Sequence, residues 1–523
     1  MALRSVLESA RHALRGALVL PGDESFDAAR RPWNLAIEQH PAGVAAPADL
    51  RDLRALLDAA GDAGVTLAVQ PTGHGAGGDL ADAVIVRMAA FDELSIDLGS
   101  GVVRIGSGVR WGAVVEALEG TGWVAPAGTS PVVAVAGYTL GGGHSWFSRT
   151  AGLGSDNLRA AWVLRSDGTH DRVDDESDPE MMWALRGAGG VVGIVTALEI
   201  DLVSAPSLWG TELTFDAADA GSVLRAVRDL SAEAPASLNV FVNSMRMPDA
   251  PQLPEEIRGR SFLSVRALST VGSADELFER VRRAGTVRRE MSGATSPKTV
   301  AASSGEPTEP TPGKGVSAAL SSLDDATIDD LLRFRELPDQ WPIMGIDIRM
   351  LGGALNDPRR AGFATLQGVG WLLHALVPVF PGVPSEPGEA SMAGFREVLA
   401  HAIAPCTVPT FLGPGETLER CGDPTSIDRL RAIRAAADPD SLIHEGRLPR
   451  CHRAETGPHP AERIRVALTI GTGGGAAPAS FVSVDASRPA VLRLRASTCA
   501  VASAARDDAR IGEMLQVPPY GHA

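Results

Sequence analysis

The sequence predicts an α+β protein built from more than one domain. Up to residue 205, segments with helical apolar spacing alternate with short strand-like runs, and glycine repeatedly marks the ends of strands. After residue 205 the strand-like runs continue without glycine-rich turns, which predicts a second domain of different construction. The chain has 523 residues, of which 44% are hydrophobic and 21% charged. That length allows about three domains and a large buried core.

The elements of the first domain, residues 1–205, follow from local patterns. Apolar residues along one face predict an amphipathic helix over 1–18, and a leucine pattern predicts another over 49–63. Strands are predicted at 66–70, 83–87, 102–105 and 194–202, and a further helix at 111–118. Glycine-rich stretches are found at 71–79, 137–143 and 187–193. These stretches are the places where the backbone can approach a ligand closely.

A second domain is expected over 206–410, with strands at 238–242, 343–351 and 371–375. The stretch 292–315 is rich in Pro, Ser, Thr and Gly, and is expected to be a loop or a flexible excursion. A segment over 411–450 is expected to return to the first domain, with a helix at 429–437 that ends before Pro439. Residues 451–523 have no hydrophobic periodicity and are expected to form a mobile tail.

Composition and charge argue against several classes of partner. The net charge is −16 with no basic block, so nucleic acid is not an expected partner. No apolar run approaches the roughly 20 residues needed to cross a bilayer, and arginines interrupt the N-terminal helix where a signal peptide would be apolar. The four cysteines lack Cys-x-x-Cys spacing, so neither a metal site nor a disulfide scaffold is indicated. The cytoplasm is the expected location.

Common enzyme motifs are also missing. Gly106, Gly108 and Gly112 follow a strand, but the third glycine comes one place too late for a dinucleotide-binding fingerprint. Gly315 follows the Gly313-Lys314 pair where a P-loop needs Ser or Thr. The sequence contains no Gly-x-Ser-x-Gly elbow and no His-Glu-x-x-His helix. Hydrolase and metalloprotease functions therefore lose their usual support.

The segment 70–78, QPTGHGAGG, is the most informative one in the chain. Small residues after a strand let backbone N–H groups converge into a nest that holds a pyrophosphate. His74 is the single imidazole in this loop, and little side-chain bulk surrounds it. Taken alone, the loop is equally consistent with a turn that carries a surface histidine.

Further motifs accompany this loop along the chain. They are Leu20–Asp23, Arg31–Asn34, Gly106–Gly112, Pro126–Val132, Gly137–Gly143, Gly152–Leu158, Trp183–Gly190, Gly193–Thr196, Arg349–Ala354 and Asp438–Leu442. In order and approximate spacing the series resembles the berberine-bridge-type FAD-linked oxidoreductases of the vanillyl-alcohol-oxidase superfamily. The resemblance covers roughly residues 15–450.

This resemblance implies a two-lobed PCMH-type FAD-binding domain and a substrate domain in which helices cover an antiparallel sheet. The residues implied to hold FAD are Thr72, Gly73, His74, Gly75 and Ala76 at the pyrophosphate, Thr129, Ser130, Val135, Gly137, Gly141, Gly142 and His144 at the flavin, and Gly193 and Val195 toward the adenosine. His74 matches the family's covalent attachment point. Ser130 stands where the family has a second, cysteinyl attachment, so no cysteinyl link is expected.

The implied activity is oxidation of an alcohol or C–N bond in a small secondary-metabolite or carbohydrate-like substrate, with O2 as the favoured acceptor, in a monomer or homodimer. The family's tyrosine base is missing from the matching stretch 409–413. Asp347 and His374, on predicted strands, are candidate catalytic residues. Asp347 with Arg349 is equally consistent with a structural ion pair, and a histidine in an apolar strand is more often a core residue. A catalytically inactive flavin-binding protein and a binding module without flavin are the alternatives.

Overall fold

The computed structural model describes residues 3–78, 80–249, 255, 257–303, 305–337, 342–380 and 382–449, together with 465–467 and 481–483. Residues 1–450 form one compact unit and residues 451–523 another. In the second unit β19 (Arg465–Ala467) pairs with β20 (Phe481–Ser483). The rest of the predicted tail lies outside the described residues.

The first lobe is a four-stranded sheet with helices against it. Its strands run in the order β1 (Ala17–Val19), β2 (Gly43–Ala46), β4 (Ala83–Val86) and β3 (Thr66–Val69). Helices α1 (Leu3–Ala13) and α3 (Leu50–Ala63) share its core, and α2 (Phe26–Arg30) lies beside β2. The helix predicted over 1–18 therefore ends early. Residues 17–19 instead pair with β2, and this pairing provides backbone hydrogen bonds that a longer helix would forgo.

The second lobe is a five-stranded antiparallel sheet. Its order is β5 (Leu94–Asp97), β6 (Val102–Gly106), β10 (Ile194–Asp201), β8 (Leu158–Leu164) and β9 (His170–Asp174). Helices α4 (Trp111–Ala117), α5 (Val135–Leu140) and α7 (Pro179–Leu185) contribute to one core with this sheet. The short strands β7 (Trp123–Val124) and β11 (Val203–Ser204) pair beside it, and α6 (Ser148–Ala151) precedes β8.

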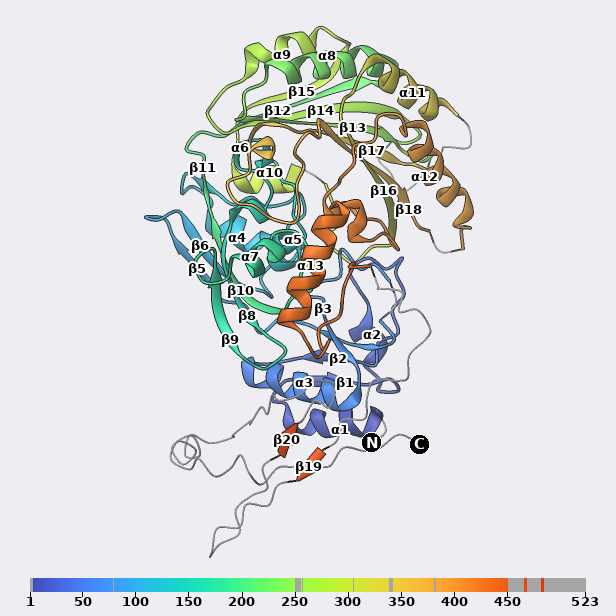
Figure 1. Ribbon diagram of the computed structural model, residues 1–523. Helices are drawn as coiled ribbons and strands as arrows, with labels where there is room; N and C mark the ends of the chain where they lie inside the picture. Colours follow the sequence, from blue (N-terminus) through green and yellow to red (C-terminus); the bar gives the residue numbers. More distant parts are fainter. Residues whose placement is uncertain are drawn as a thin grey trace, which may run out of the picture. The chain divides into compact units, whose positions relative to one another are not determined.

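A seven-stranded sheet forms the rest of the larger unit, and every neighbouring pair in it is antiparallel. Its order is β15 (Val287–Ala294), β12 (Trp209–Asp216), β14 (Ser261–Ser269), β13 (Leu238–Arg246), β17 (Gly345–Met350), β18 (Trp371–Pro378) and β16 (Gly313–Leu320). Helices α8 (Ala220–Glu233), α9 (Asp275–Arg282), α11 (Asp325–Glu336) and α12 (Glu386–Val398) cover one face, and the two lobes lie on the other (Figure 1). The antiparallel sheet covered by helices is thus confirmed.

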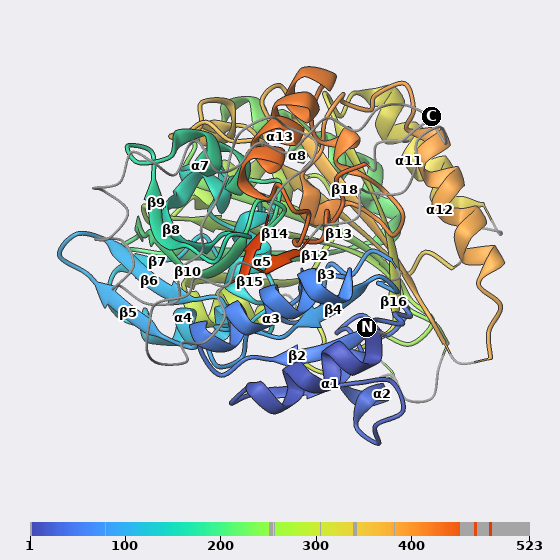
Figure 2. The same cartoon turned by 60° about the horizontal axis from the view of Figure 1, so that its bottom comes forward.

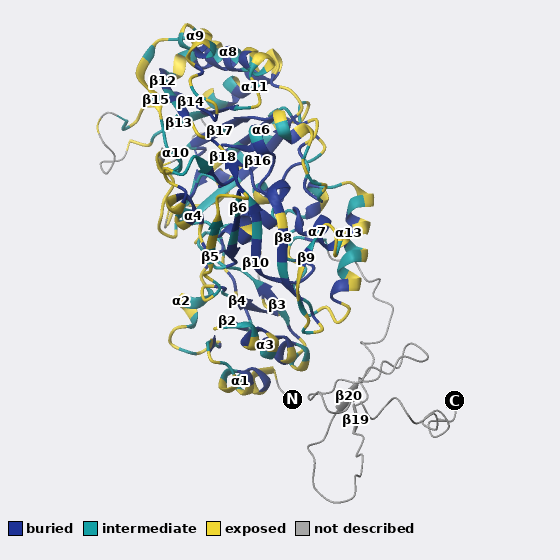
Figure 3. Ribbon diagram, turned by 90° about the vertical axis from the view of Figure 1, so that its left-hand side faces the viewer, coloured by how far each residue is buried: buried dark blue, intermediate teal, exposed yellow. Residues whose placement is uncertain are grey.

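Burial follows this layering. The inner strands of the sheets are buried along most of their length, whereas the edge strands β5, β9 and β15 and the outer surfaces of α8, α9 and α1 are largely exposed (Figure 3). The longest described helices, α3, α8 and α13 (Pro424–Ala437), have 14 residues each. No helix in the described part of the chain is both long and apolar enough to cross a bilayer.

The stretch 292–315 is not a simple loop, so that prediction was wrong. It contains the end of β15, helix α10 (Pro297–Ser303) and the start of β16. Val300 of α10 is 9% exposed and packs in a cluster that contains Trp146 and Phe147. Tertiary packing of a few apolar residues therefore overrides a composition that locally favours a loop.

The segment after α12 runs back along the lobes (Figure 2). Helix α13 packs against α7 and ends at Asp438, whose carboxylate accepts hydrogen bonds from the backbone of Leu442 and Ile443. Beyond it, the backbone of residues 442–444 bonds to Leu67 of β3, at 2.8 Å and 3.0 Å. This is where the returning segment was expected, and the division into domains stays a prediction.

Truncation after Arg450 should leave the melting temperature and bound cofactor of the larger unit almost unchanged. The reason is that residues 1–450 form a compact unit with its own cores. Differential scanning calorimetry and cofactor content of the truncated and full-length proteins would measure this. An insoluble or cofactor-free truncated protein would contradict the boundary at residue 450.

Candidate cofactor and substrate site

The His74 loop follows β3, and its backbone needs glycine. Gly73 has φ +81°, and a Cβ there would lie 2.7 Å from a side-chain carbon of Pro32. The His74 ring is stacked on Trp33, with centroids 4.1 Å apart and planes 16° apart. Its Nδ1 shares a hydrogen bond of 3.0 Å with the Thr72 hydroxyl. Its Nε2 is buried and has no hydrogen-bond partner among the described residues.

The surroundings keep this imidazole uncharged. Burial, and after it the nearby positive charge of Arg110, lower the pKa of His74 to about 4. At neutral pH the ring is therefore neutral and retains a nitrogen lone pair. A neutral imidazole is the form that reacts as a nucleophile.

A second glycine-rich turn, after α5, faces the large sheet. Gly142 and Gly143 have φ +95° and +72°, and a Cβ on Gly143 would lie 2.4 Å from the Tyr138 ring. Several buried polar atoms near the two glycine turns have no hydrogen-bond partner among the described residues: the hydroxyls of Ser107, Ser130, Thr139 and Ser155 and Nε2 of His144. Buried polar groups are normally satisfied, so this group of atoms indicates a site for a polar ligand.

The other predicted cofactor residues occupy different kinds of position. Thr129 donates a short hydrogen bond to Glu306, which follows α10 in the chain. Val135 and Val195 are 0% and 3% exposed and their side chains belong to the core, so only their backbones are available to a ligand. A Cβ on Gly193 would lie 2.5 Å from Val163, so this glycine is required for close packing. Thr72, Gly75 and Ala76 belong to the His74 loop, Gly137 lies within α5, and Gly141 caps the end of that helix.

The candidate catalytic residues lie side by side on the inner face of the seven-stranded sheet, the face turned toward the lobes. Asp347 on β17 is directly opposite Asn243 on β13 and His374 on β18. His374 is in turn opposite Ser317 on β16, and its Nδ1 shares a 2.9 Å hydrogen bond with the Ser317 hydroxyl. Burial and the charge of Arg349 lower the pKa of His374 to about 4, although Asp347 opposes this. A row of polar side chains thus crosses four strands.

Arg349 connects this row to the second glycine turn. Its side chain lies between the rings of Phe241 and Phe411, 4.7 Å and 5.0 Å from their centroids. Nε donates to Asp347 Oδ2 at 2.5 Å, and Nη1 lies 3.4 Å from Nδ1 of His144. Because a guanidinium only donates, Nδ1 of His144 accepts and the ring proton is on Nε2. Burial lowers the pKa of His144 well below its usual value, consistent with this neutral form.

The sequence did not decide whether Asp347 and Arg349 form an ion pair, and the structure shows that they do. The pair also lies beside His144 and His374, so its structural role does not exclude a role for Asp347 in catalysis. Sequence reasoning missed the stack of Trp33 on His74 and the contact of Arg349 with His144. Neither contact has a local sequence signal, because the partners come from separate elements.

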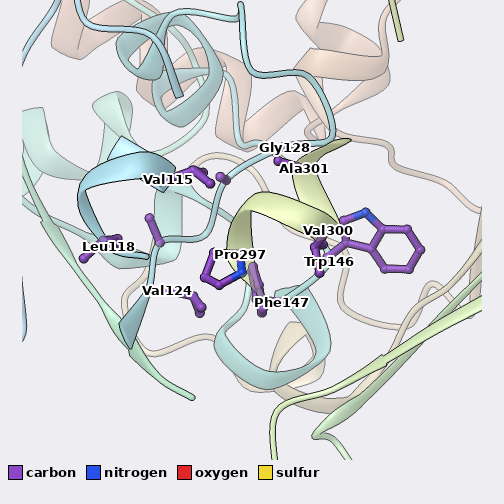
Figure 4. A pocket seen from close by; sticks show the side chains of 11 residues that line it. Val115, Leu118, Val124, Gly128, Trp146, Phe147, Pro297, Val300 and Ala301 are labelled. Atoms are coloured by element: carbon purple, nitrogen blue, oxygen red, sulfur yellow. The ribbon is translucent and has the colours of Figure 1, made fainter. Parts of the chain in front are cut away.

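Two cavities lie away from these residues. An apolar pocket of about 20 Å³ lies between α4 and α10 and is lined by Val115, Trp146, Phe147 and Val300 among others (Figure 4). It is too small for more than a water-sized molecule. A larger groove of about 660 Å³ is lined by residues of α8 and of the turns at 321–324 and 351–356, and includes none of the predicted site residues.

Acid should destabilise the protein through its buried histidines. The pKa values of His74 and His374 are lowered to about 4 in the folded state, from an ordinary value of 6.5. Between these values the unfolded chain binds protons that the folded chain does not, so stability is complete above pH 6.5 and declines as the pH falls toward 4. One pKa unit corresponds to about 1.4 kcal/mol, so several kcal/mol should be lost.

Urea unfolding of the cofactor-free protein between pH 7 and pH 4 would measure this loss. In a variant with His74→Phe and His374→Leu the decline should be clearly shallower. An equally steep decline in the variant would show that other groups cause it.

Comparison with known proteins identifies the ligand class. A family model described as "FAD binding domain" matches residues 41–174, which include both the His74 loop and the second glycine turn. The chain carries an FAD-binding domain. The cofactor class predicted from the sequence is thereby confirmed.

Curated relatives match parts of the chain. (R)-6-hydroxynicotine oxidase of Paenarthrobacter nicotinovorans is 28% identical over 245 residues, which are 45% of this chain and 54% of that protein. Glucooligosaccharide oxidase of Sarocladium strictum is 31% identical over 191 residues, 35% of this chain and 38% of that protein. The chain thus matches about half of the length of the first and less of the second.

Solved structures resemble most of the chain. BBE-like 1 of Physcomitrella patens superposes with a TM-score of 0.73, covering 87% of this chain and 100% of that chain at 17% identity. Xylooligosaccharide oxidase of Myceliophthora thermophila C1, in complex with xylobiose, gives 0.72, covering 86% and 98% at 19% identity. These likenesses extend beyond the FAD-binding domain and confirm the berberine-bridge-type fold.

The residues present fit FAD. Glycine turns suit the pyrophosphate, because backbone amides can approach and stabilise phosphate oxygens without a lysine. The partnerless hydroxyls and the His144 Nε2–H suit the many donors and acceptors of a flavin and its ribityl chain. The FAD-binding domain therefore has groups suited to the pyrophosphate and to the flavin with its ribityl chain.

Proposed function

We propose that this chain is an FAD-dependent oxidase that removes a hydride from an alcohol or C–N bond of a small secondary-metabolite or carbohydrate-like substrate. When bound, FAD supplies the hydride acceptor and passes the electrons to O2. The observation that carries the proposal is the polar row containing Asp347 and His374, which Arg349 links directly to the second glycine turn.

Three residues of this row, and the side chains around it, each have a role in the proposal. Asp347 accepts the proton from the substrate hydroxyl or amine, since a carboxylate on the inner face can reach a group held between the sheet and the turn. Arg349 holds that carboxylate at 2.5 Å and keeps it in one orientation. Asn243 and Ser317 supply hydrogen bonds that orient a polar substrate. The apolar faces of Phe241 and Phe411 keep water from Arg349.

The relatives support an oxidase. Two of them are named oxidases, one of hydroxynicotine and one of glucooligosaccharides, and these names include both a nitrogen heterocycle and a sugar. The alternative of an inactive flavin-binding protein receives no support from them. A binding module without flavin is inconsistent with the FAD-binding domain.

A panel of alcohols, sugars and cyclic amines, mixed anaerobically with the purified yellow protein, would test the activity. A substrate should bleach the flavin absorbance, and air should restore it with formation of H2O2. A protein that stays yellow with every compound would contradict an oxidase. Bleaching without reoxidation by air would identify a dehydrogenase instead.

The proposal includes a covalent bond from His74 to FAD and no cysteinyl bond. A neighbour solved in this fold, glucooligosaccharide oxidase from Acremonium strictum, carries "6-s-cysteinyl, 8 alpha-N1-histidyl FAD". Here Ser130 is 4% exposed, and its hydroxyl has no partner among the described residues. A hydroxyl is scarcely ionised at pH 7, so it does not add to the ring as a thiolate does.

Ser130→Cys should introduce a second attachment without any helper enzyme, because a thiol then lies where the hydroxyl now lies. Mass measurement of digested protein should find a flavin-bearing peptide containing residue 130. In the double variant with His74→Ala, that peptide should carry all of the covalent flavin. Ala127→Cys, in the same turn, is the matched control and should remain unmodified. Flavin on another cysteine, or on none, would contradict the placement of Ser130 at the ring.

A further inference from the structure

We propose that Trp33 is the positioning residue for the attachment of FAD to His74: its indole holds the plane of the imidazole and excludes water from one face. This inference rests on the proposed covalent link. Trp33 comes from the segment between α2 and β2, outside the matched FAD-binding region, and the proposed function gives it no role.

The contact is a stack and not an edge contact. The ring centroids are 4.1 Å apart and the planes are only 16° from parallel, so the indole covers one imidazole face. The backbone reinforces the stack, because the Trp33 N–H donates to the carbonyl of Thr72 at 2.9 Å. Thr72 also holds Nδ1 of His74 through its hydroxyl, at 3.0 Å.

Together these contacts leave the imidazole one orientation. Rotation about the Cβ–Cγ bond would break both the stack and the Thr72 hydrogen bond. Formation of a bond to the flavin needs a neutral nitrogen held at the correct distance and angle, and misplacement of a reacting group by about 1 Å can cost a factor of about 100 in rate. Trp33 contributes to both needs, since it fixes the ring and removes water that would stabilise the protonated form.

Trp33 is itself held by the large sheet. Its carbonyl accepts a hydrogen bond from Thr311 N–H at 3.2 Å, and the side chain of the adjacent Asn34 donates to the Gly313 carbonyl at 2.9 Å. Gly313 begins β16, an edge strand of that sheet. Backbone contacts from both the His74 loop and the segment that leads into β16 therefore hold Trp33 in place.

The reaction that Trp33 assists is balanced with O2 as the oxidant. A C–N bond forms between His74 and the methyl carbon of the ring, with loss of one methyl hydrogen and of the imidazole N–H hydrogen. Two electrons and two protons pass to O2, which becomes H2O2. No other co-reactant is needed.

The test uses full-length apoprotein produced under riboflavin starvation. FAD is added in air, and covalent flavin is followed by fluorescence of the denatured protein on a gel, while total binding is followed by ultrafiltration. For Trp33→Leu the attachment rate should fall on the order of tenfold to a hundredfold with total binding unchanged. Trp33→Phe should keep most of the rate. Trp123→Leu, at an equally half-buried tryptophan in β7, should match the wild type.

A second readout does not depend on attachment. In apoprotein whose histidines carry an NMR isotope label, titration should give His74 a pKa of about 4 in the wild type. In Trp33→Leu this pKa should rise toward 6.5. Equal attachment rates in wild type and Trp33→Leu would overturn the role of Trp33, and so would loss of total FAD binding in that variant. A wild type that binds FAD and never attaches it would overturn the proposed covalent link itself.

Discussion

Asp347→Asn should slow the anaerobic bleaching of the flavin by substrate about 10²- to 10⁴-fold, the usual contribution of a general base. Asparagine has nearly the same size, and its amide oxygen still accepts the hydrogen bond from Arg349, now 2.5 Å from Asp347. It cannot accept the proton of a substrate hydroxyl or amine. Stopped-flow absorbance under saturating substrate measures the effect on the chemical step alone.

Two comparisons make this result specific. Asp325→Asn removes a surface carboxylate on α11 that pairs with Arg225 and Arg228, and should leave the bleaching rate unchanged. His374→Gln should lower the rate less than Asp347→Asn, because its imidazole already shares a hydrogen bond with Ser317. A larger effect from His374→Gln would make the histidine the base and Asp347 its ion-paired neighbour.

His74→Ala should abolish covalent flavin completely. The wild type should give a fluorescent band on a denaturing gel, and the variant none, because the loop then offers no nucleophile. Both proteins should still bind FAD before denaturation, since the glycine turns and partnerless hydroxyls remain. His12→Ala, at an exposed position of α1, is the control and should keep the band. A wild-type flavin that acid precipitation releases would reduce His74 to a noncovalent contact.

The parts of the molecule that the sequence predicts well are those that depend on short stretches of chain. Helix α3 begins after its capping Asp49 and ends at Gly64 in the left-handed region, much as the local pattern indicates. The His74 loop is likewise recognisable from a strand followed by glycines. In the same way, alternation along β17 indicates that Asp347 and Arg349 share one face.

What the sequence does not predict depends on residues far apart in the chain. Arg349 and His144 are separated by 205 positions, and neither residue type nor spacing indicates that they meet. Helix α10 is not predicted from the sequence, because it has few apolar residues and one of them, Val300, packs against Trp146 and Phe147, which are distant in the chain. Trp33 belongs to a recognisable motif, yet its stack on His74 follows from the course of the chain between α2 and β2.

The alternation of the large sheet has a consequence for how this protein can evolve. On β17 and β18, Ile346, Ile348 and Leu373 point to the helices and carry the packing, whereas Asp347 and His374 point the other way. Substitutions on the inner face therefore leave the helix-packed core intact, because side chains on opposite faces of a strand do not share contacts. The polar positions of this face can therefore change with little effect on the helix-packed core, whereas Leu372 and Phe241 on the same face belong to other buried clusters. Arg349 is also constrained, since it ties its strand to the cofactor turn and its replacement would disturb both.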